Sequence, residues 1–367
     1  MQKISTTMRN GSSSNNTSSK AASFAAVSFC SCPAFPMVTN PLRVSEIMNE
    51  FLKEDIINVK SWFDLGDCNY EHDHKDDSIP DSGVVYCNIE HIHEFFKKCE
   101  STVNKYVVVS GFSDYGVAYQ QQHPVGVDML KWIPFVEHMI PELGYNPLVI
   151  PPRCDTDNCD LNDTYSVKCY SHTMSTFKGI PSNVTKWFLV NSMLSQDRIQ
   201  GIPLGIGKDA TDDILATNQY ELSETDNWVY VNWQNYTLER KYLKSFFLSN
   251  GFDWVTYVEE PKEFKEYLDE LSRHVYAICP PGNGLDCYRI LECIYVGTIP
   301  IVFNSPCMEY LKDLPILIID SFDELNIENL KLQYESVSKK MNDSGIDKAK
   351  FSYWKNEISQ AARALND

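Results

Sequence analysis

The sequence lacks both a long apolar run and a block of basic residues. No stretch of about 18 apolar residues occurs, so no segment has the character of a transmembrane helix. Acidic residues outnumber basic ones by 50 to 32, and the formal net charge is −18. Nucleic acids and anionic membranes attract proteins through clustered lysine and arginine, so the sequence argues against both as partners. A small anionic ligand fits this composition, because one or two well-placed arginines are enough to bind it.

The sequence also lacks the paired cysteine spacing of a zinc site. Its twelve cysteines include no Cys-x-x-Cys pair. Cys279, Cys287, Cys293 and Cys307 fall within apolar or helical patterns, which is typical of reduced, buried thiols rather than of a disulfide framework. We predict no bound metal and no cofactor, because the remaining candidate ligands do not converge on one ion; they are His72, His74, His91, His93, Cys154, Cys159, Cys169 and His172.

The size and composition of the chain indicate two folded domains. A length of 367 residues suits two domains of roughly 150 residues each. The hydrophobic content of 43% is enough to build real cores. Residues 1–40 are predicted to be a disordered tail, since the first twenty are rich in Ser, Thr and Asn. The run 21–35 lacks the layout of a signal peptide, so we expect a cytoplasmic protein, with the secretory-pathway lumen as the alternative.

Short apolar runs alternate with helical patterns along the chain, which indicates an α/β fold. The alternation predicts a parallel, doubly wound sheet, most clearly in the second half. In the first half we expect a helix at 89–99 and strands at 105–109 and 187–190. In the second half we expect strands at 228–233, 254–257, 274–279, 299–303 and 316–319. We expect helices at 238–250 and 261–271, and a third helix that follows the loop 280–285 and ends at residue 296.

One segment of the second half combines a strand, a glycine-rich turn, a helix and another strand. Gly282 and Gly284 let the backbone approach a ligand closely, and Asp286 is placed to cap the helix that follows. The helix N-terminus favours phosphate oxygens, and Arg289 in its first turn can bind a diphosphate through two parallel hydrogen bonds. Glu292, one turn later, can accept hydrogen bonds from ribose hydroxyls. The alternative is that Arg289 and Glu292 form a surface ion pair and the glycines only make a turn.

This segment resembles the donor-binding motif of exostosin-like glycosyltransferases, known as glycosyltransferase family 47. The family pattern reads approximately Cys-Pro-x-Gly-x-Gly-x-Asp-x-x-Arg-x-x-Glu-x-x-x-x-Gly-x-x-Pro-Ile. It is matched at Cys279, Pro280, Gly282, Gly284, Asp286, Arg289, Glu292, Gly297 and Pro300. A looser resemblance covers most of residues 187–325. The first half is similar only faintly, at Ser113-Asp114 and at Trp187-Phe188 with Asn191.

The resemblance implies a soluble GT-B enzyme with two Rossmann-like domains that face a cleft. Residues 41–205 would bind the acceptor, residues 206–340 would bind the nucleotide sugar, and residues 341–367 would form a helical tail. The glycine-rich segment 201–207 is expected to be the entrance to the interdomain linker. The enzyme would move a sugar from a donor, a UDP-sugar by expectation, to a glycan or glycoconjugate hydroxyl. It would need no metal and would invert the anomeric carbon.

The resemblance also assigns roles to individual residues. Arg289 would neutralise the diphosphate and Glu292 would hold the ribose. Arg240 would add a second positive charge after the strand that ends near Asn232. Tyr288 departs from the pattern, because many relatives have His there. The donor-binding set is therefore Asn232, Arg240, Pro280, Gly282, Gly284, Asp286, Arg289 and Glu292.

Inversion requires a base that takes the proton of the acceptor hydroxyl. Asp114 is the first candidate, since it follows the strand 105–109; its alternative role is that of a turn or helix cap. His123 is the second candidate, on the same loop and with a suitable intrinsic pKa. Without a metal, Arg289 and the helix N-terminus would stabilise the developing diphosphate charge.

Two other functions are compatible with the sequence. One is a non-catalytic protein that binds nucleotides or sugars and has lost the base. The other is a manganese-dependent GT-A transferase built on Asp155-Thr156-Asp157. The aspartates of that motif lie in an acidic, polar loop with no strand before it, so we interpret the motif as coincidental.

Overall fold

The computed structural model describes most of the chain from residue 53 onward. Pro41–Asp367 form one compact unit. The described residues are 53–66, 68–70, 79, 81–111, 113–119, 164–168, 173–194, 197–217, 228–234, 237–340 and 344–365. Within them two parallel sheets and one small antiparallel sheet are present. The predicted mixed α/β class with parallel sheets is therefore confirmed, while the arrangement as two Rossmann-like domains around a cleft stays a prediction.

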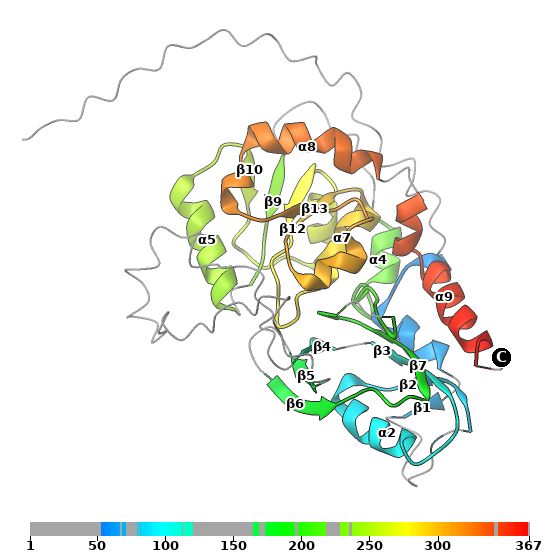
Figure 1. Ribbon diagram of the computed structural model, residues 1–367. Coiled ribbons are helices and arrows are strands. Elements are labelled where there is room, and N and C mark those ends of the chain that lie inside the picture. The colour runs from blue at the N-terminus through cyan, green and yellow to red at the C-terminus, as the bar shows by residue number, and fades with distance from the viewer. Residues whose placement is uncertain are drawn as a thin grey trace, which may run out of the picture. The chain divides into compact units, whose positions relative to one another are not determined.

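The first parallel sheet has the strand order β1-β2-β3-β7-β8. Valine-rich runs supply its central strands, because β-branched side chains pack well on a pleated surface. Helix α2 covers one face and helix α9 packs against the other (Figure 1). The strands are β1 (Cys68–Asn69), β2 (Gly83–Tyr86), β3 (Tyr106–Ser110), β7 (Val184–Leu189) and β8 (Ile199–Gly201).

The sequence pattern of helix α2 (Ile92–Cys99) explains how it covers the sheet. Its buried residues are Ile92, Phe95, Phe96 and Cys99, which recur at helical spacing and form one apolar face. The preceding 3₁₀ turn η3 begins after Asn88, whose side chain accepts a hydrogen bond from a backbone N–H of that turn. Together η3 and α2 match the helix expected at 89–99.

The second parallel sheet has the order β10-β9-β11-β12-β13. Helices α5 and α8 pack on one face, and α6 and α7 pack on the other, so the sheet is wound on both sides as predicted. The strands are β9 (Val229–Val231), β10 (Val255–Tyr257), β11 (Tyr276–Ile278), β12 (Ile299–Phe303) and β13 (Leu317–Ile319). The helices are α5 (Leu238–Asn250), α6 (Phe264–Leu271), α7 (Tyr288–Val296) and α8 (Ile327–Lys339).

Shorter elements and the C-terminal helix complete the described chain. Helix α9 (Phe351–Arg363) buries Trp354 and Ile358. The third sheet, in which β5 pairs with both β4 and β6, was not predicted, because its strands lie in segments rich in polar residues and turn formers. The short elements are η1 (Lys53–Asp55), η2 (Val59–Leu65), β4 (Gly116–Tyr119), β5 (Thr164–Lys168), β6 (Thr173–Lys178), α4 (Thr211–Leu215), η6 (Pro306–Leu311), η7 (Phe322–Glu324) and η8 (Ser344–Ala349).

The segment 201–207, expected to be the entrance to the interdomain linker, is buried over most of its length. Residues 201–206 are all buried. Ile206 exchanges backbone hydrogen bonds with Ile57 and Val59, at 2.8 and 3.1 Å. A Cβ on Gly201 would lie 2.0 Å from the Tyr310 ring, so this glycine is required by close packing. The segment is therefore part of the core.

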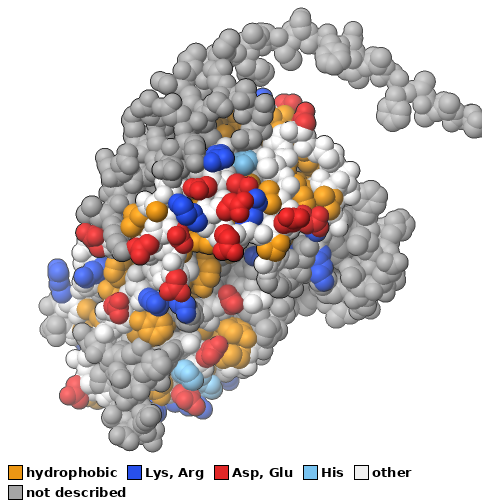
Figure 2. All heavy atoms as spheres, turned by 180° about the vertical axis from the view of Figure 1, so that it is seen from behind, with side chains coloured by type: hydrophobic (Ala, Val, Ile, Leu, Met, Phe, Trp, Pro, Cys, Tyr) orange, Lys and Arg blue, Asp and Glu red, His pale blue; other side chains and the backbone are white. Residues whose placement is uncertain are grey.

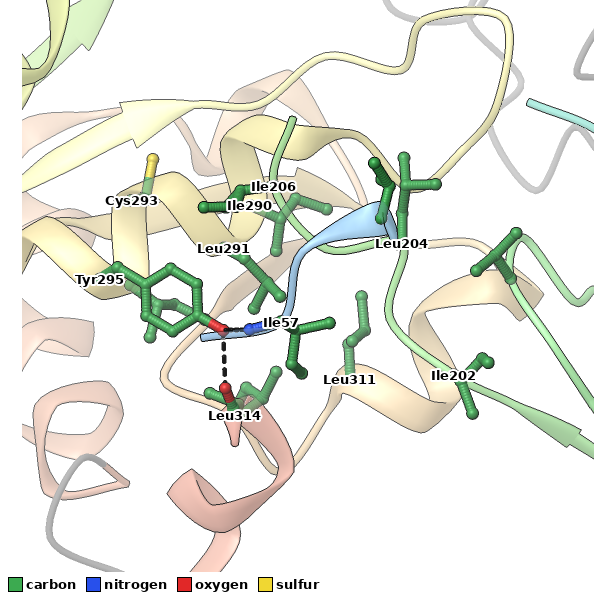
Figure 3. Close-up of a cluster of buried hydrophobic side chains, with 14 of the residues drawn as sticks. Ile57, Ile202, Leu204, Ile206, Ile290, Leu291, Cys293, Tyr295, Leu311 and Leu314 are labelled. Carbon is green, nitrogen blue, oxygen red and sulfur yellow. Dashed lines mark hydrogen bonds between the residues drawn. The ribbon is translucent and has the colours of Figure 1, made fainter. Parts of the chain in front are cut away.

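Helix α7 lies at the centre of the largest core cluster (Figure 3). Its seven residues from Ile290 to Val296 are all buried, which is typical of a helix surrounded by other elements. The hydroxyl of Tyr295 accepts a hydrogen bond from the Ile57 backbone N–H at 2.9 Å and donates one to the Ala349 carbonyl at 2.7 Å. One side chain of α7 therefore holds two chain segments that are far apart in the sequence.

The surface reflects the excess of acidic over basic residues in the sequence. On the face drawn in Figure 2, acidic side chains are spread widely, with lysine and arginine scattered among them. Among the described residues, no helix combines the length and the apolar character needed to cross a membrane.

Replacement of Tyr295 by Phe should destabilise the fold, because it leaves the Ile57 N–H and the Ala349 carbonyl without their partner. We expect a loss of about 2–3 kcal/mol in the free energy of unfolding, measured by urea denaturation. Tyr353→Phe is the control, since that hydroxyl makes no hydrogen bond within the described residues. Equal stability of the two variants would contradict the bridging role.

Candidate functional site

The strand order of the second sheet defines where a ligand would bind. The chain runs from β9 to its neighbour β10, and then crosses to β11 on the other side of β9. Ligands of open parallel sheets bind at the carboxyl ends of the strands, where the strand order reverses. The loop after β9 and the loop after β11 meet this description. They contain, respectively, Asn232 and the glycine-rich turn from Pro280 to Asp286.

Arg240, at the start of α5, holds the glycine-rich turn by two hydrogen bonds. Its Nε donates to the Pro281 carbonyl at 2.9 Å, and its Nη2 donates to the Pro280 carbonyl at 3.3 Å. A Cβ on Gly282 would lie 3.4 Å from the same Nη2. Arg240 thus shapes the turn as well as contributing charge. Burial lowers the pKa of Arg240, and the nearby charge of Arg289 acts in the same direction.

Arg289, in the first turn of α7, is joined to Glu292 through a tyrosine. The Arg289 Nε donates to the Tyr267 hydroxyl at 3.0 Å, and that hydroxyl donates to Glu292 Oε2 at 3.0 Å. Burial raises the pKa of Tyr267 well above its usual value, so the hydroxyl keeps its proton and can serve both partners. The relay replaces the direct ion pair considered as an alternative: within the described residues, no carboxylate lies at ion-pair distance from Arg289.

This arrangement leaves most of the donor capacity of Arg289 free. A guanidinium has five N–H donors, and only Nε makes a hydrogen bond within the described part of the chain. Glu292 is 7% exposed, and Tyr267 is the only described residue that donates to it. Burial raises the pKa of Glu292, while the Arg289 charge and the Tyr267 hydroxyl act in the opposite direction.

Asp286 does not cap helix α7. The N-cap residue is Cys287, and no side chain caps this end. Instead the Asp286 carboxylate is buried, and its Oδ2 accepts from the Leu204 N–H at 2.8 Å and from the Tyr310 hydroxyl at 3.2 Å. The side chain therefore ties the turn to the buried segment 201–207. The hydrogen bonds from Leu204 and Tyr310 hold the side chain toward the core, and its donor-binding role stays a prediction.

Gly284 packs closely against another residue of the protein, and its role in ligand approach stays a prediction. A Cβ at this position would lie 2.7 Å from Nδ2 of Asn191, so the close approach is to a side chain of the protein. The Asn191 Oδ1 also accepts a hydrogen bond from the Asp286 N–H at 2.8 Å. Asn191 follows strand β7 of the first sheet, so these contacts join residues of the two halves of the sequence.

Asp114, the first candidate base, lies beside the glycine-rich turn. Its Oδ2 accepts a hydrogen bond from Nδ2 of Asn283 at 3.2 Å, and the residue is exposed. Its charge also acts on Arg240 and Tyr288, which places it near the starts of α5 and α7. The structure thus brings Asp114 and the predicted donor residues together. His123, the second candidate, lies outside the described residues.

The structure gives less support to the remaining predictions for the site. Asn232 follows β9 and its Nδ2 reaches the Glu260 carbonyl at 3.5 Å, which is a weak contact. No group of three His, Cys, Asp or Glu among the described residues could hold a metal ion. The aspartates at 155 and 157 lie outside the described residues.

A cavity of about 490 Å³ lies elsewhere, against Asn58, Thr211 and Phe351, and none of the predicted site residues lines it.

Three residues of the site were not predicted as site residues from the sequence: Tyr267, Asn191 and Asn283. Tyr267 sits on the apolar face of α6, where a buried hydroxyl must find a partner, and this requirement was a usable signal. Asn283 lies inside the predicted turn, but its contact with Asp114 depends on how the halves fold together. Asn191 was noted only as part of a faint resemblance.

Comparisons with known proteins add little to this geometry. No protein-family model matches the chain, and no curated protein matches it in sequence. One similar solved structure is a trehalose-6-phosphate synthase, described as an enzyme of glycosyltransfer with retention. It is 10% identical, the match covers 78% of this chain and 71% of that chain, and the TM-score is 0.28. A TM-score this low does not establish a shared fold.

The buried carboxylate of Asp286 should make stability depend on pH. Burial raises the pKa of Asp286 from 3.8 to about 6. The folded state therefore holds a proton that the unfolded chain has released, and the stability from this group falls as pH rises through about 6. A difference of about two units between the pKa of Asp286 in the folded and unfolded states corresponds to about 3 kcal/mol of stability. Relative to Asp286→Asn, the wild type should lose about that much between about pH 4 and pH 7 in urea unfolding. A difference independent of pH would contradict it.

Proposed function

We propose that the protein is a glycosyltransferase that takes its sugar from a nucleotide-sugar donor. The observation that carries the proposal is the pair of arginines at the reversal point of the second sheet, one of which keeps its terminal nitrogens free. The exostosin-like motif supports the same assignment, since its Arg289 and Glu292 lie in one hydrogen-bonded relay at the start of α7.

A nucleoside diphosphate suits this site chemically. Diphosphate oxygens accept parallel hydrogen bonds from a guanidinium, and the uncapped N-terminus of α7 offers backbone N–H groups and a favourable dipole beside it. The Tyr267 relay fixes the direction of the Arg289 side chain before a ligand arrives. Glu292 is left as an acceptor for the ribose hydroxyls, and a UDP-sugar is the donor we propose.

The acceptor side would be formed by the loop that carries Asp114. In the proposed reaction the acceptor oxygen attacks the anomeric carbon, the bond from that carbon to the diphosphate oxygen breaks, and the electron pair leaves with the diphosphate. Asp114 takes the proton of the acceptor hydroxyl. Attack from the side opposite the leaving group inverts the anomeric carbon. Arg289 and Arg240 stabilise the charge that develops on the diphosphate, so the chemistry proposed needs no metal.

Replacement of Arg289 by Ala should weaken UDP binding by about ten- to a hundredfold, because two charge-assisted hydrogen bonds are lost. Isothermal titration calorimetry measures this directly. Tyr267→Phe should have a smaller effect, about three- to tenfold, since the guanidinium remains but loses its orienting partner. Arg363→Ala, at the exposed end of α9, is the matched charge control. Equal UDP affinity in wild type and Arg289→Ala would overturn the diphosphate assignment.

Replacement of Asp114 by Asn should reduce kcat by about 10²- to 10⁴-fold and leave UDP affinity unchanged. The amide oxygen can still accept the hydrogen bond from Asn283, so the loop keeps its contact while the base is lost. Asp253→Asn, at an exposed turn, controls for the change of charge. Unchanged turnover in Asp114→Asn would reject this base. A wild type that binds UDP and transfers no sugar would indicate a binding protein instead.

A further inference from the structure

Asn191 has a backbone conformation that is rare for its type. It follows strand β7 with φ of 53°, and among the described residues it is the one non-glycine with positive φ. The residue is 1% exposed. Asparagine enters this left-handed region more readily than most residues, but it persists there only where the surroundings fix it. Such residues are concentrated at functional sites, so the contacts of Asn191 decide what the conformation achieves.

Both polar atoms of the Asn191 side-chain amide make hydrogen bonds. Its Nδ2 donates to the Ser113 carbonyl at 3.0 Å, and its Oδ1 accepts from the Asp286 N–H at 2.8 Å. Ser113 directly precedes the candidate base Asp114. Asp286 stands three residues before Arg289. A single amide group therefore connects the loop of the base to the turn of the diphosphate arginine.

Two glycines are fitted to this residue. A Cβ on Gly284 would lie 2.7 Å from Asn191 Nδ2, and a Cβ on Gly116 would lie 1.8 Å from the Asn191 backbone oxygen. Both distances are shorter than real Cβ contacts. The start of β4 and the turn before α7 are thus each shaped to receive Asn191, one at its backbone and the other at its side chain.

We propose that Asn191 is a positioning residue that sets the distance between the base and the diphosphate site. This inference rests on the proposed function, because it assigns Asn191 to the same reaction. Displacement of a reacting group by about 1 Å can reduce a rate about 10²-fold. The left-handed backbone turns the amide of Asn191 so that one side chain reaches both loops. Asn191 touches neither donor nor acceptor and acts through Asp114 and Arg289.

The decisive variants are Asn191→Gly, Gly284→Ala and the two combined. Glycine accepts a positive φ, so Asn191→Gly keeps the backbone path and removes only the amide group. We expect kcat to fall about 10²-fold with the KM for the donor changed less than threefold. Gly284→Ala should be damaging alone because of the Asn191 side chain. In the combined variant that obstacle is gone, so adding Gly284→Ala should have at least tenfold less effect on kcat.

Gly282→Ala provides the matched comparison in the same turn. Its Cβ would meet only Arg240 Nη2, at 3.4 Å, and not Asn191. Whatever effect Gly282→Ala has should be the same with and without the Asn191 amide. The melting temperature of every variant, measured in parallel, shows that it folds. If Asn191→Gly does not fold, Asn191→Asp takes its place, because it keeps the acceptor for the Asp286 N–H and replaces the donor to Ser113 by a carboxylate oxygen.

The outcomes separate this inference from the proposed function. A wild type that transfers sugar, with an unchanged kcat in folded Asn191→Gly, overturns the positioning role and leaves the proposed function intact. A wild type that transfers no sugar from any nucleotide-sugar donor overturns both, because no reaction remains for Asn191 to position. Strictly additive effects of Asn191→Gly and Gly284→Ala on kcat also reject the inference. A kcat loss relieved by the paired substitution supports it.

Discussion

The burial of helix α7 is the constraint on which the rest of the structure depends. A helix whose residues from Ile290 to Val296 are all buried has no face left for water, so other parts of the chain must surround it. The segment near Ile57, the segment 201–206 and the η6 turn do so, and Tyr295 fixes two of its neighbours by hydrogen bonds (Figure 3). Arg289 stands where this helix meets the surface. The core therefore fixes the direction of the helix that carries the candidate ligand-binding arginine.

Buried polar groups connect this core to the site. Taking a carboxylate out of water is unfavourable unless hydrogen bonds offset the loss. The Asp286 carboxylate receives two, from Leu204 and Tyr310, and burial still raises its pKa to about 6. The Asp286 carboxylate thus holds the turn before α7, although its ionisation in this buried position lowers the stability of the fold. Expense of this kind is common where function, rather than packing, selects the residues.

The sequence predicted the regular elements well and the contacts between distant segments poorly. The helix at 238–250 and the strand at 299–303 lie where the apolar periodicity placed them, because local pattern determines such elements. The burial of residues 201–206 was not predicted, since glycine and proline occur in linkers and in tightly packed core turns alike. Gly284 was predicted from the turn pattern, but its close contact with Asn191 was not. No local sequence pattern indicates the contacts of Asn191, because its hydrogen-bond partners Ser113 and Asp286 lie far from it in sequence.

The charge distribution gives the site its polarity. The chain carries a net charge of −18, yet Arg240 and Arg289 lie close enough for one to lower the pKa of the other. Among the described residues, neither arginine has a carboxylate at ion-pair distance. Two like charges held together repel each other, and in a partly buried setting water screens them incompletely. A doubly charged anion between them would turn this repulsion into attraction, and the surrounding acidic surface would disfavour the same anion elsewhere. The arginine pair is therefore the place on an otherwise acidic protein where we expect the proposed diphosphate to bind.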